Sequence, residues 1–233
     1  MSREFELNKE VTLEATPEQV WDAIATGPGI SSWFMGPHTV EPGVGGRMTL
    51  TIGDFSESST ITAWDPPKHL AYRGDTAPDG SFHAMEYLVE GREQGSTVLR
   101  FVHSGVVSDD WGDEYLDQTS HGWDMYFHTM GLYLRHFPGQ FATYAYSPMS
   151  VDWPTLLERL NVSEPLRVGD AITLAPEGME PVEGIVDYSG EGARPFLGVR
   201  GPEGLYRFFG GAMVGIGHHL FGDDRPWLEW AQK

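Results

Sequence analysis

The sequence predicts an α+β protein in which an antiparallel sheet packs against a long helix. Three observations predict this class. A strand with strict alternation leads into a capped helix near the N-terminus, several short strands separated by turn residues follow, and a long helical pattern ends at Pro138 and Gly139. Because short turns join the strands, we expect an antiparallel meander and not a parallel sheet.

The first strand is expected over residues 5–15. Its odd positions are apolar except for Lys9 and its even positions are polar, which indicates one buried face and one exposed face. Thr16 follows as a candidate N-cap, Pro17 suits the first helical turn, and Gln19 completes a capping box. A helix is therefore predicted to begin at Pro17.

Short strands are expected next, at residues 47–52, 58–64, 69–73, 82–90 and 97–104. Turn residues separate them, including the triplet Asp65, Pro66 and Pro67 and the segment 77–80. The glycine-rich segment 43–46 is interpreted as a turn, because no helix follows it as a phosphate-binding loop would require.

The helical pattern begins near residue 109 and is long. Carboxylates crowd its start, where they suit the positive end of the helix dipole, and Gly122 and residues 117–120 are candidate points for a break or bend. Apolar residues recur at spacings of four, three and four, and this stripe is expected to lie on the concave face of the sheet. The acidic residues are Asp109, Asp110, Asp113 and Glu114, and the stripe is Trp123, Phe127, Met130 and Leu134.

Composition indicates a folded protein that needs no covalent staples. The 233 residues are 40% hydrophobic and include no cysteine, which excludes disulfides and thiolate chemistry. The charged N-terminus lacks an apolar leader and no run approaches the length of a membrane span, so a cytoplasmic protein without membrane contact is expected. The net charge of −19 opposes binding to nucleic acid or to an anionic membrane.

Four segments in order resemble the Hsp90 ATPase activator homologue (AHSA1-like) family of the START-like, or SRPBCC, superfamily. They are EVTLEATPEQVWDAIATGPGISSWF from Glu10, DPPKHLAY from Asp65, TVLRFVHSGV from Thr97 and GWDMYFHTMGLYL from Gly122, and the resemblance covers roughly residues 4–138. It implies a helix-grip fold, in which a curved antiparallel sheet surrounds a long C-terminal helix. Many START-like relatives bind an apolar small molecule between sheet and helix.

Alternation identifies the residues that would line such a cavity. Two neighbouring strands should point Met85, Tyr87 and Val89, and Leu99, Phe101 and His103, toward the helix. At any single position a filled core is the commoner explanation, but the implied fold favours a pocket for the set. The predicted ligand-binding residues are Trp33, Phe34, Met85, Tyr87, Leu99, Phe101, His103, Trp123 and Phe127.

Metal and cofactor sites are not expected. His121 and His128 lie two helical turns apart, about 10 Å at 1.5 Å per residue, which is too far to share one ion. The adjacent pair His218 and His219 would point to opposite faces of a strand.

An acid/base enzyme is harder to exclude. His83, Glu86 and His103 lie on the two strands expected to line the cavity, where burial could shift their pKa values toward a catalytic range. The alternation nevertheless places His83 and Glu86 on opposite faces, and the serine-hydrolase elbow Gly-x-Ser-x-Gly is absent from the sequence. The sequence assigns no catalytic residue.

We expect two domains, a START-like domain over residues 1–140 and a small α+β domain over residues 150–233. In the second, a helix over 152–160 should precede four strands near 167–174, 182–188, 196–200 and 205–209 and a final helix containing Trp227 and Trp230. This order resembles a shortened copy of the first domain. The aromatic segments 204–211 and 217–221 suit a small core, an interface or a lid, and a homodimer is a possible assembly.

Three functions follow from these observations and the resemblance. The first is a binding protein for a hydrophobic or aromatic small molecule, without catalysis. The second is an enzyme similar to a polyketide cyclase or hydrolase acting on an aromatic substrate. The third is an Hsp90-type co-chaperone, which is less expected because eukaryotic-type activators carry a further domain in front of the one that this chain resembles.

Overall fold

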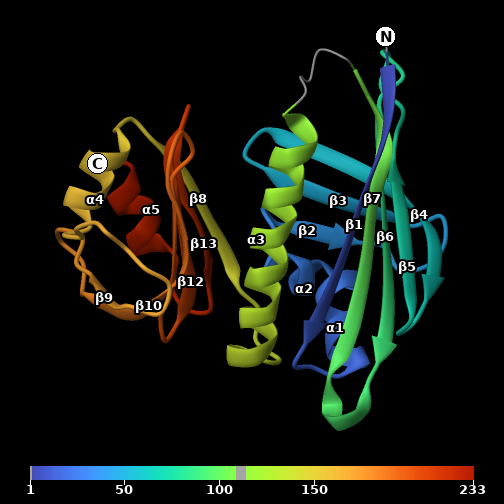
Figure 1. Ribbon diagram of the computed structural model, residues 1–233, viewed down its shortest axis with the longest axis horizontal. Coiled ribbons are helices and arrows are strands. Elements are labelled where there is room, and N and C mark those ends of the chain that lie inside the picture. The colour runs from blue at the N-terminus through green and yellow to red at the C-terminus, as the bar shows by residue number, and fades with distance from the viewer. Residues whose placement is uncertain (1, 109–113) are drawn as a thin grey trace. The chain divides into compact units, whose positions relative to one another are not determined.

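The computed structural model describes residues 2–108 and 114–233, which form two compact units (Figure 1). Unit 1 extends to Gly139 and unit 2 runs from Gln140 to Lys233. Both combine an antiparallel sheet with a few helices, so the predicted α+β class is confirmed. In the parts of the chain that the structure describes, no helix has the length and apolar character needed to cross a membrane.

Unit 1 contains a seven-stranded sheet with the order β1-β7-β6-β5-β4-β3-β2, in which all neighbours are antiparallel. The last strand of this unit along the chain therefore pairs with the first. The sheet curves so that β2 and β3 pass behind helix α3 (Figure 1). The strands are β1 (Ser2–Leu13), β2 (His38–Val40), β3 (Arg47–Ile52), β4 (Phe55–Asp65), β5 (His69–Gly74), β6 (Phe82–Gly91) and β7 (Thr97–Ser108).

The start of unit 1 follows the sequence pattern. Every even position of β1 is exposed and every odd position is buried or half-buried, which confirms the predicted alternation. Helix α1 (Pro17–Ala25) begins at the predicted proline, and Thr16 and Gln19 form both hydrogen bonds of the capping box. A second helix, α2 (Gly27–Ser31), and the strand β2 were not predicted, because each is too short to show a period.

Helix α3 (Tyr115–His136) follows β7, and a single 3-10 turn, η1 (Glu93–Gly95), joins β6 to β7. The predicted acidic start at residues 109–113 lies outside the described residues. The helix continues unbroken through Gly122, contrary to the expected break, because tertiary packing holds its apolar side. The predicted stripe of Trp123, Phe127, Met130 and Leu134 is buried.

Unit 2 contains a six-stranded antiparallel sheet with the order β8-β13-β12-β11-β10-β9. Its first strand also pairs with its last, so the units share one arrangement: strand, helix, meander, closing strand and final helix. The elements are β8 (Thr143–Met149), α4 (Trp153–Arg159), β9 (Ala171–Leu174), β10 (Val182–Gly190), β11 (Phe196–Arg200), β12 (Gly204–Phe209), β13 (Val214–Leu220) and α5 (Arg225–Ala231).

Two of these strands differ from the sequence-based expectation. The segment before residue 150 forms β8 and belongs to the sheet of unit 2, and the aromatic segment after Phe209 forms β13. The four strands predicted for unit 2 therefore correspond to four of the six strands in its sheet. Strand β13 was missed because all seven of its residues are buried, so its pattern does not alternate.

Candidate functional site

Three contacts identify the face of the unit 1 sheet that points toward α3. Lys9 of β1 donates a hydrogen bond of 2.6 Å from Nζ to Oδ1 of Asp124 on α3. The ring centroids of Phe101 on β7 and Trp123 on α3 are 4.2 Å apart. Trp123 also donates from Nε1 to Nδ1 of His103 at 3.0 Å. Lys9 thus interrupts the apolar pattern of β1 because it reaches across to a helix carboxylate.

The cross-strand register places the other candidate residues on the same inward face. Met85 lies opposite His103, Tyr87 opposite Phe101, and Val89 opposite Leu99. Directly opposed residues of antiparallel strands project to the same side of a sheet. The structure therefore brings the candidates from β6 and β7 onto the face that α3 covers.

The predicted aromatic residues pack against one another. The rings of Phe34 and Trp123 are stacked with centroids 5.3 Å apart, Trp33 stacks on Phe127 at 6.1 Å, and Phe101 meets Phe127 edge-on at 5.1 Å. Trp33 is anchored by a hydrogen bond of 2.8 Å from Nε1 to the carbonyl oxygen of Ala23. All these rings except the half-buried Phe34 are at most 5% exposed, so they form a filled core at this end of the inward face.

A chain of polar groups lies beside this aromatic core. Trp123 donates to Nδ1 of His103, and Nε2 of His103 lies 2.9 Å from Nδ1 of His83 on β6. Phe5 of β1 contacts both imidazoles, with ring centroids 5.0 Å from His103 and 5.7 Å from His83. We call this chain the Trp-His-His chain.

The Trp-His-His chain fixes the tautomers of both imidazoles. An indole N–H can only donate, so Nδ1 of His103 must present a lone pair to Trp123. Burial and, to a smaller extent, the neighbouring His83 together lower the pKa of His103 to about 3, so the ring is neutral and its proton lies on Nε2. That proton is donated to Nδ1 of His83, whose pKa burial also lowers.

The Trp-His-His chain limits the acid/base chemistry that its two imidazoles can perform. The lone pair of each neutral imidazole is already engaged by a donor, so neither ring offers a free basic nitrogen in this state. Glu86 projects to the opposite face, where its Oε1 lies 2.7 Å from Nε2 of His69. The predicted separation of His83 from Glu86 is confirmed.

The inward face is covered unevenly. On β4 to β7, Ile61, Leu70 and Leu99 are at most 1% exposed. Farther along the same face, a group of inward-facing side chains is only half-buried although the sheet curves around the helix. This half-covered region comprises Leu50 of β3, Ser59 of β4, Tyr72 of β5, and His83 and Met85 of β6.

A glycine and a carboxylate border the half-covered region. Gly74 lies on this face between Ser59 and His83, and a Cβ atom built there would find no neighbour closer than 3.6 Å. The exposed Glu57 of β4 lies at its edge, where its carboxylate charge raises the pKa values of Tyr72 and of Tyr115 on α3, although burial is the main cause for both. The region therefore combines apolar side chains with a few polar groups and one negative charge.

Two buried hydroxyls complete the polar groups of this face. The Oη atoms of Tyr72 and Tyr87 are 3.4 Å apart, and their rings are stacked with centroids at 6.2 Å. Burial raises the pKa of Tyr72 to about 12 and raises that of Tyr87 well above its ordinary value. Tyr72, Ser59 and Leu50 were not predicted as site residues, although the alternation of their strands was a usable signal.

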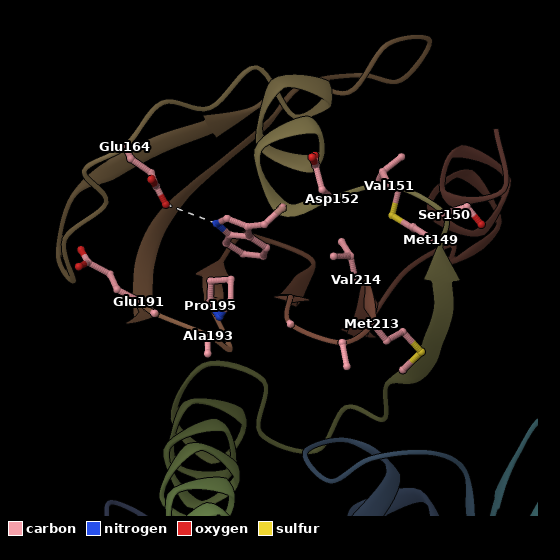
Figure 2. A pocket seen from close by; sticks show the side chains of 14 residues that line it. Met149, Ser150, Val151, Asp152, Glu164, Glu191, Ala193, Pro195, Met213 and Val214 are labelled. Atoms are coloured by element: carbon pink, nitrogen blue, oxygen red, sulfur yellow. Dashed lines mark hydrogen bonds between the residues drawn. The ribbon is translucent and has the colours of Figure 1, made fainter.

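Hollows in the described residues lie elsewhere, and two of them are near residues considered above. A groove of about 330 Å³ runs between β1 and α3, with Phe127 among its lining residues. In unit 2, a hollow of about 960 Å³ is lined by methionines, valines and three carboxylates, and the Trp153 indole N–H donates to Glu164 at 3.4 Å (Figure 2). Within residues 2–108 and 114–233, no three His, Asp or Glu side chains gather closely enough to hold a metal ion.

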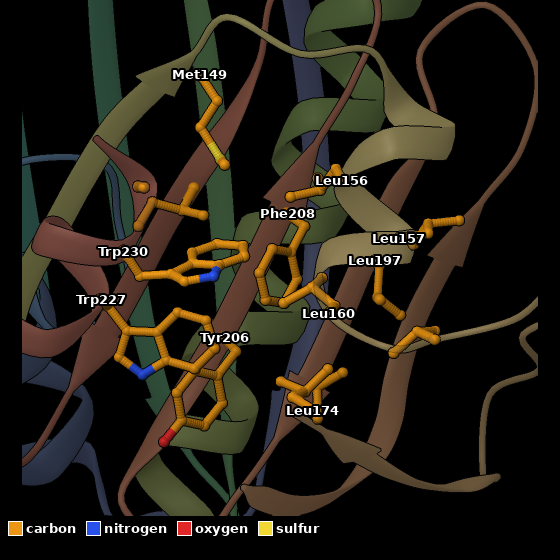
Figure 3. Close-up of a cluster of buried hydrophobic side chains, with 14 of the residues drawn as sticks. Met149, Leu156, Leu157, Leu160, Leu174, Leu197, Tyr206, Phe208, Trp227 and Trp230 are labelled. Atoms are coloured by element: carbon orange, nitrogen blue, oxygen red, sulfur yellow. The ribbon is translucent and has the colours of Figure 1, made fainter. Parts of the chain in front are cut away.

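The aromatic segments of unit 2 contribute to its own core. Tyr206 and Phe208 of β12 lie between the α5 indoles and the leucines of α4 (Figure 3). His218 of β13 is fully buried among them, with its ring centroid 4.7 Å from that of Trp227. This arrangement supports the core interpretation for Tyr206 and Phe208.

Comparison with known proteins gives a family and a fold. The family model described as "Activator of Hsp90 ATPase homolog 1-like protein" matches residues 14–135. No curated protein matches the sequence. A solved protein from Rhizobium leguminosarum is 17% identical with a TM-score of 0.50, and the match covers 58% of this chain and 97% of that one.

Two other solved structures are similar at lower TM-scores. The Aha1 dimer from Colwellia psychrerythraea is 19% identical with a TM-score of 0.48, and the match covers 56% of this chain and 96% of that one. DynU16, a protein from the dynemicin biosynthetic locus, is 14% identical with a TM-score of 0.48, and the match covers 96% of this chain and 91% of that one. At these identities the likeness concerns the fold and not the activity.

Proposed function

We propose that this chain, which belongs to the activator of Hsp90 ATPase homolog 1-like family, binds an apolar or aromatic small molecule in the half-covered region of unit 1. One observation carries the proposal: Leu50, Tyr72 and Met85 point toward α3 yet remain half-exposed, while residues farther along the same face are fully buried. In a helix-grip protein, uncovered inward surface of this kind is where a ligand would fit.

The chemistry of the half-covered region suits such a ligand. Small-molecule sites are mostly apolar and aromatic, with a few well-placed polar groups that set orientation. Here Leu50 and Met85 supply apolar surface, the Phe101 ring lies beside Tyr87, and Ser59, Tyr72 and His83 supply polar atoms. Bound in this way, a ligand would cover side chains that the protein itself leaves only half-buried.

A binding role is favoured over catalysis. A cyclase or hydrolase similar to polyketide enzymes would need a general base or nucleophile beside its substrate. The imidazole lone pairs of His83 and His103 are already engaged within the Trp-His-His chain. The co-chaperone alternative rests on the family description alone.

Native mass spectrometry of the protein as purified from cells provides the first test. A retained mass of a few hundred daltons that disappears on unfolding in organic solvent would support the proposal. Binding of an added apolar probe, fluorene, would then be measured by titration. We expect saturable binding with one site per chain.

Two tryptophan substitutions on the same strand locate the site. Met85→Trp would fill the half-covered region and should abolish fluorene binding. Leu88→Trp is the matched control, because Leu88 lies on the opposite face of β6 and is 40% exposed. Equal loss in both variants, or unchanged binding in Met85→Trp, would contradict the proposed location. Circular dichroism checks that both variants fold, and Ser59→Leu is a second, smaller obstruction.

A further inference from the structure

We infer that the ligand of unit 1 carries an uncharged oxygen acceptor, such as the carbonyl of an aromatic ketone, and that the hydroxyls of Tyr72 and Tyr87 bind this oxygen. The inference rests on the proposed function and specifies the class of molecule. It is based on the number of hydroxyl protons, the position of the two rings, and the charge beside them.

The two hydroxyls carry more protons than they can use between themselves. Among the residues that the structure describes, each has the other as its hydrogen-bond partner. Either oxygen can be the donor, but only one proton can lie between them, so the second has to point elsewhere. The separation of 3.4 Å is also longer than the usual O–H···O distance of about 2.7–2.8 Å. The pair is therefore suited to share a third oxygen that accepts from both.

The position of the pair matches the half-covered region. Tyr87 is 3% exposed, and its ring centroid lies 4.8 Å from that of Phe101, so its hydroxyl is held in place by the aromatic core. Tyr72 is half-buried and is the cross-strand partner of Met85, which belongs to the half-covered region. An oxygen bound by both hydroxyls would lie where the filled core ends and the uncovered surface begins.

The charge beside the pair selects against anionic ligands. Oε1 of Glu57 lies 3.8 Å from the position that a Cβ atom on Gly74 would take, so the carboxylate borders the half-covered region. Burial is the main cause of the raised pKa of Tyr72, the Glu57 charge raises it further, and the same charge acts on His83 and on Tyr115. A carboxylate or phenolate ligand would meet the same repulsion. Because burial also keeps both tyrosines protonated, the pair acts as a donor to a neutral acceptor at ordinary pH.

The test compares two rigid tricyclic probes of nearly equal size. Fluorene is a hydrocarbon, whereas 9-fluorenone carries one carbonyl oxygen. We expect fluorenone to bind about five-fold more tightly than fluorene, as one additional net hydrogen bond would provide. In the double variant Tyr72→Phe/Tyr87→Phe, in which neither hydroxyl remains, the preference should fall toward one while fluorene affinity is retained. Tyr206→Phe is the control, because it removes a hydroxyl from the core of unit 2.

A second readout does not depend on affinity. The infrared carbonyl stretch of bound fluorenone should shift to lower frequency in the wild-type protein, shift less in Tyr72→Phe, where one donor remains, and return in the double variant. Should the double variant fail to fold, the smaller carbonyl shift in Tyr72→Phe, which changes only the half-buried tyrosine, still carries the test. Fluorene binding without any preference for fluorenone, or an unshifted carbonyl, would overturn the acceptor inference and leave the proposed function standing. If neither probe binds, the proposed function fails and the inference fails with it.

Discussion

Acidification should destabilise unit 1 through His103. Its pKa is about 3 in the folded protein and 6.5 for an ordinary imidazole, so between these values the unfolded chain binds a proton that the folded chain does not. A lowered folded-state pKa gives stability that is complete above pH 6.5 and is lost as the pH falls toward 3. Protonation would also place an N–H on Nδ1, facing the Trp123 N–H.

The magnitude follows from the same two pKa values. At pH 5 the folded ring is still neutral, so the loss is about 1.4 kcal/mol for each pH unit below the unfolded pKa, or about 2 kcal/mol in total. His38, whose pKa burial lowers to about 4, adds a loss of the same sign, and so do His83 and His218, whose pKa values burial also lowers. A wild-type measurement therefore includes all four residues, and a variant is needed to isolate His103.

The assay is urea unfolding at several pH values between 5 and 8. In His103→Gln the amide can still accept a hydrogen bond from Trp123, but it does not titrate. Between pH 8 and pH 5 the free energy of unfolding of the wild type should fall by about 2 kcal/mol more than that of this variant. The difference in stability between the two proteins should therefore shrink by that amount. Gln118→Asn, an exposed change on α3 that adds and removes no titratable group, should run parallel to the wild type. A constant difference between wild type and His103→Gln across this range would refute the reasoning.

Three substitutions test the packing and capping described above. Gly105→Ala would place a Cβ atom in steric overlap with the carbonyl oxygen of Phe82, so it should destabilise unit 1 by at least about 2 kcal/mol in chemical denaturation. Gly122→Ala meets nothing within 4 Å on α3 and should stabilise by about 0.5–1 kcal/mol; destabilisation would show that the glycine is needed. Thr16→Ala removes the capping box of α1 and should lower the melting temperature, at a cost of about 1 kcal/mol, whereas Thr16→Ser should retain most of the stability.

Local patterns predicted the elements that are stabilised locally. The alternation of β1, the capping box of α1 and the apolar stripe of α3 each lie within one segment, and each was found as predicted. Strand β13 could not be predicted from a local pattern, because both of its faces are buried and its residues do not alternate. Gly215 of this strand occupies a position where a Cβ atom would lie 2.6 Å from the carbonyl oxygen of Ser147. Ser147 is far away in the sequence, so no local pattern reveals this contact.

The candidate site was predictable in part for the same reason. Alternation within β6 and β7 placed Tyr87, Phe101 and His103 on the inward face. It could not show that coverage of that face stops near Tyr72, because the extent of coverage depends on how far the helix and the curved sheet reach. The hydrogen bond between His83 and His103 likewise depends on the register of two strands.

The pairing of first with last strands has a consequence during synthesis. Ser2 pairs with Ser108 in one sheet, and Thr143 pairs with Leu220 in the other. As the chain leaves the ribosome, each opening strand must wait without its partner until nearly the whole unit has emerged, and such distant contacts slow folding. During that delay the opening strand offers an unpaired edge, and the alternating glutamates of β1 would discourage association with other nascent chains. A stop codon late in either unit would thus leave its earliest strand unpaired.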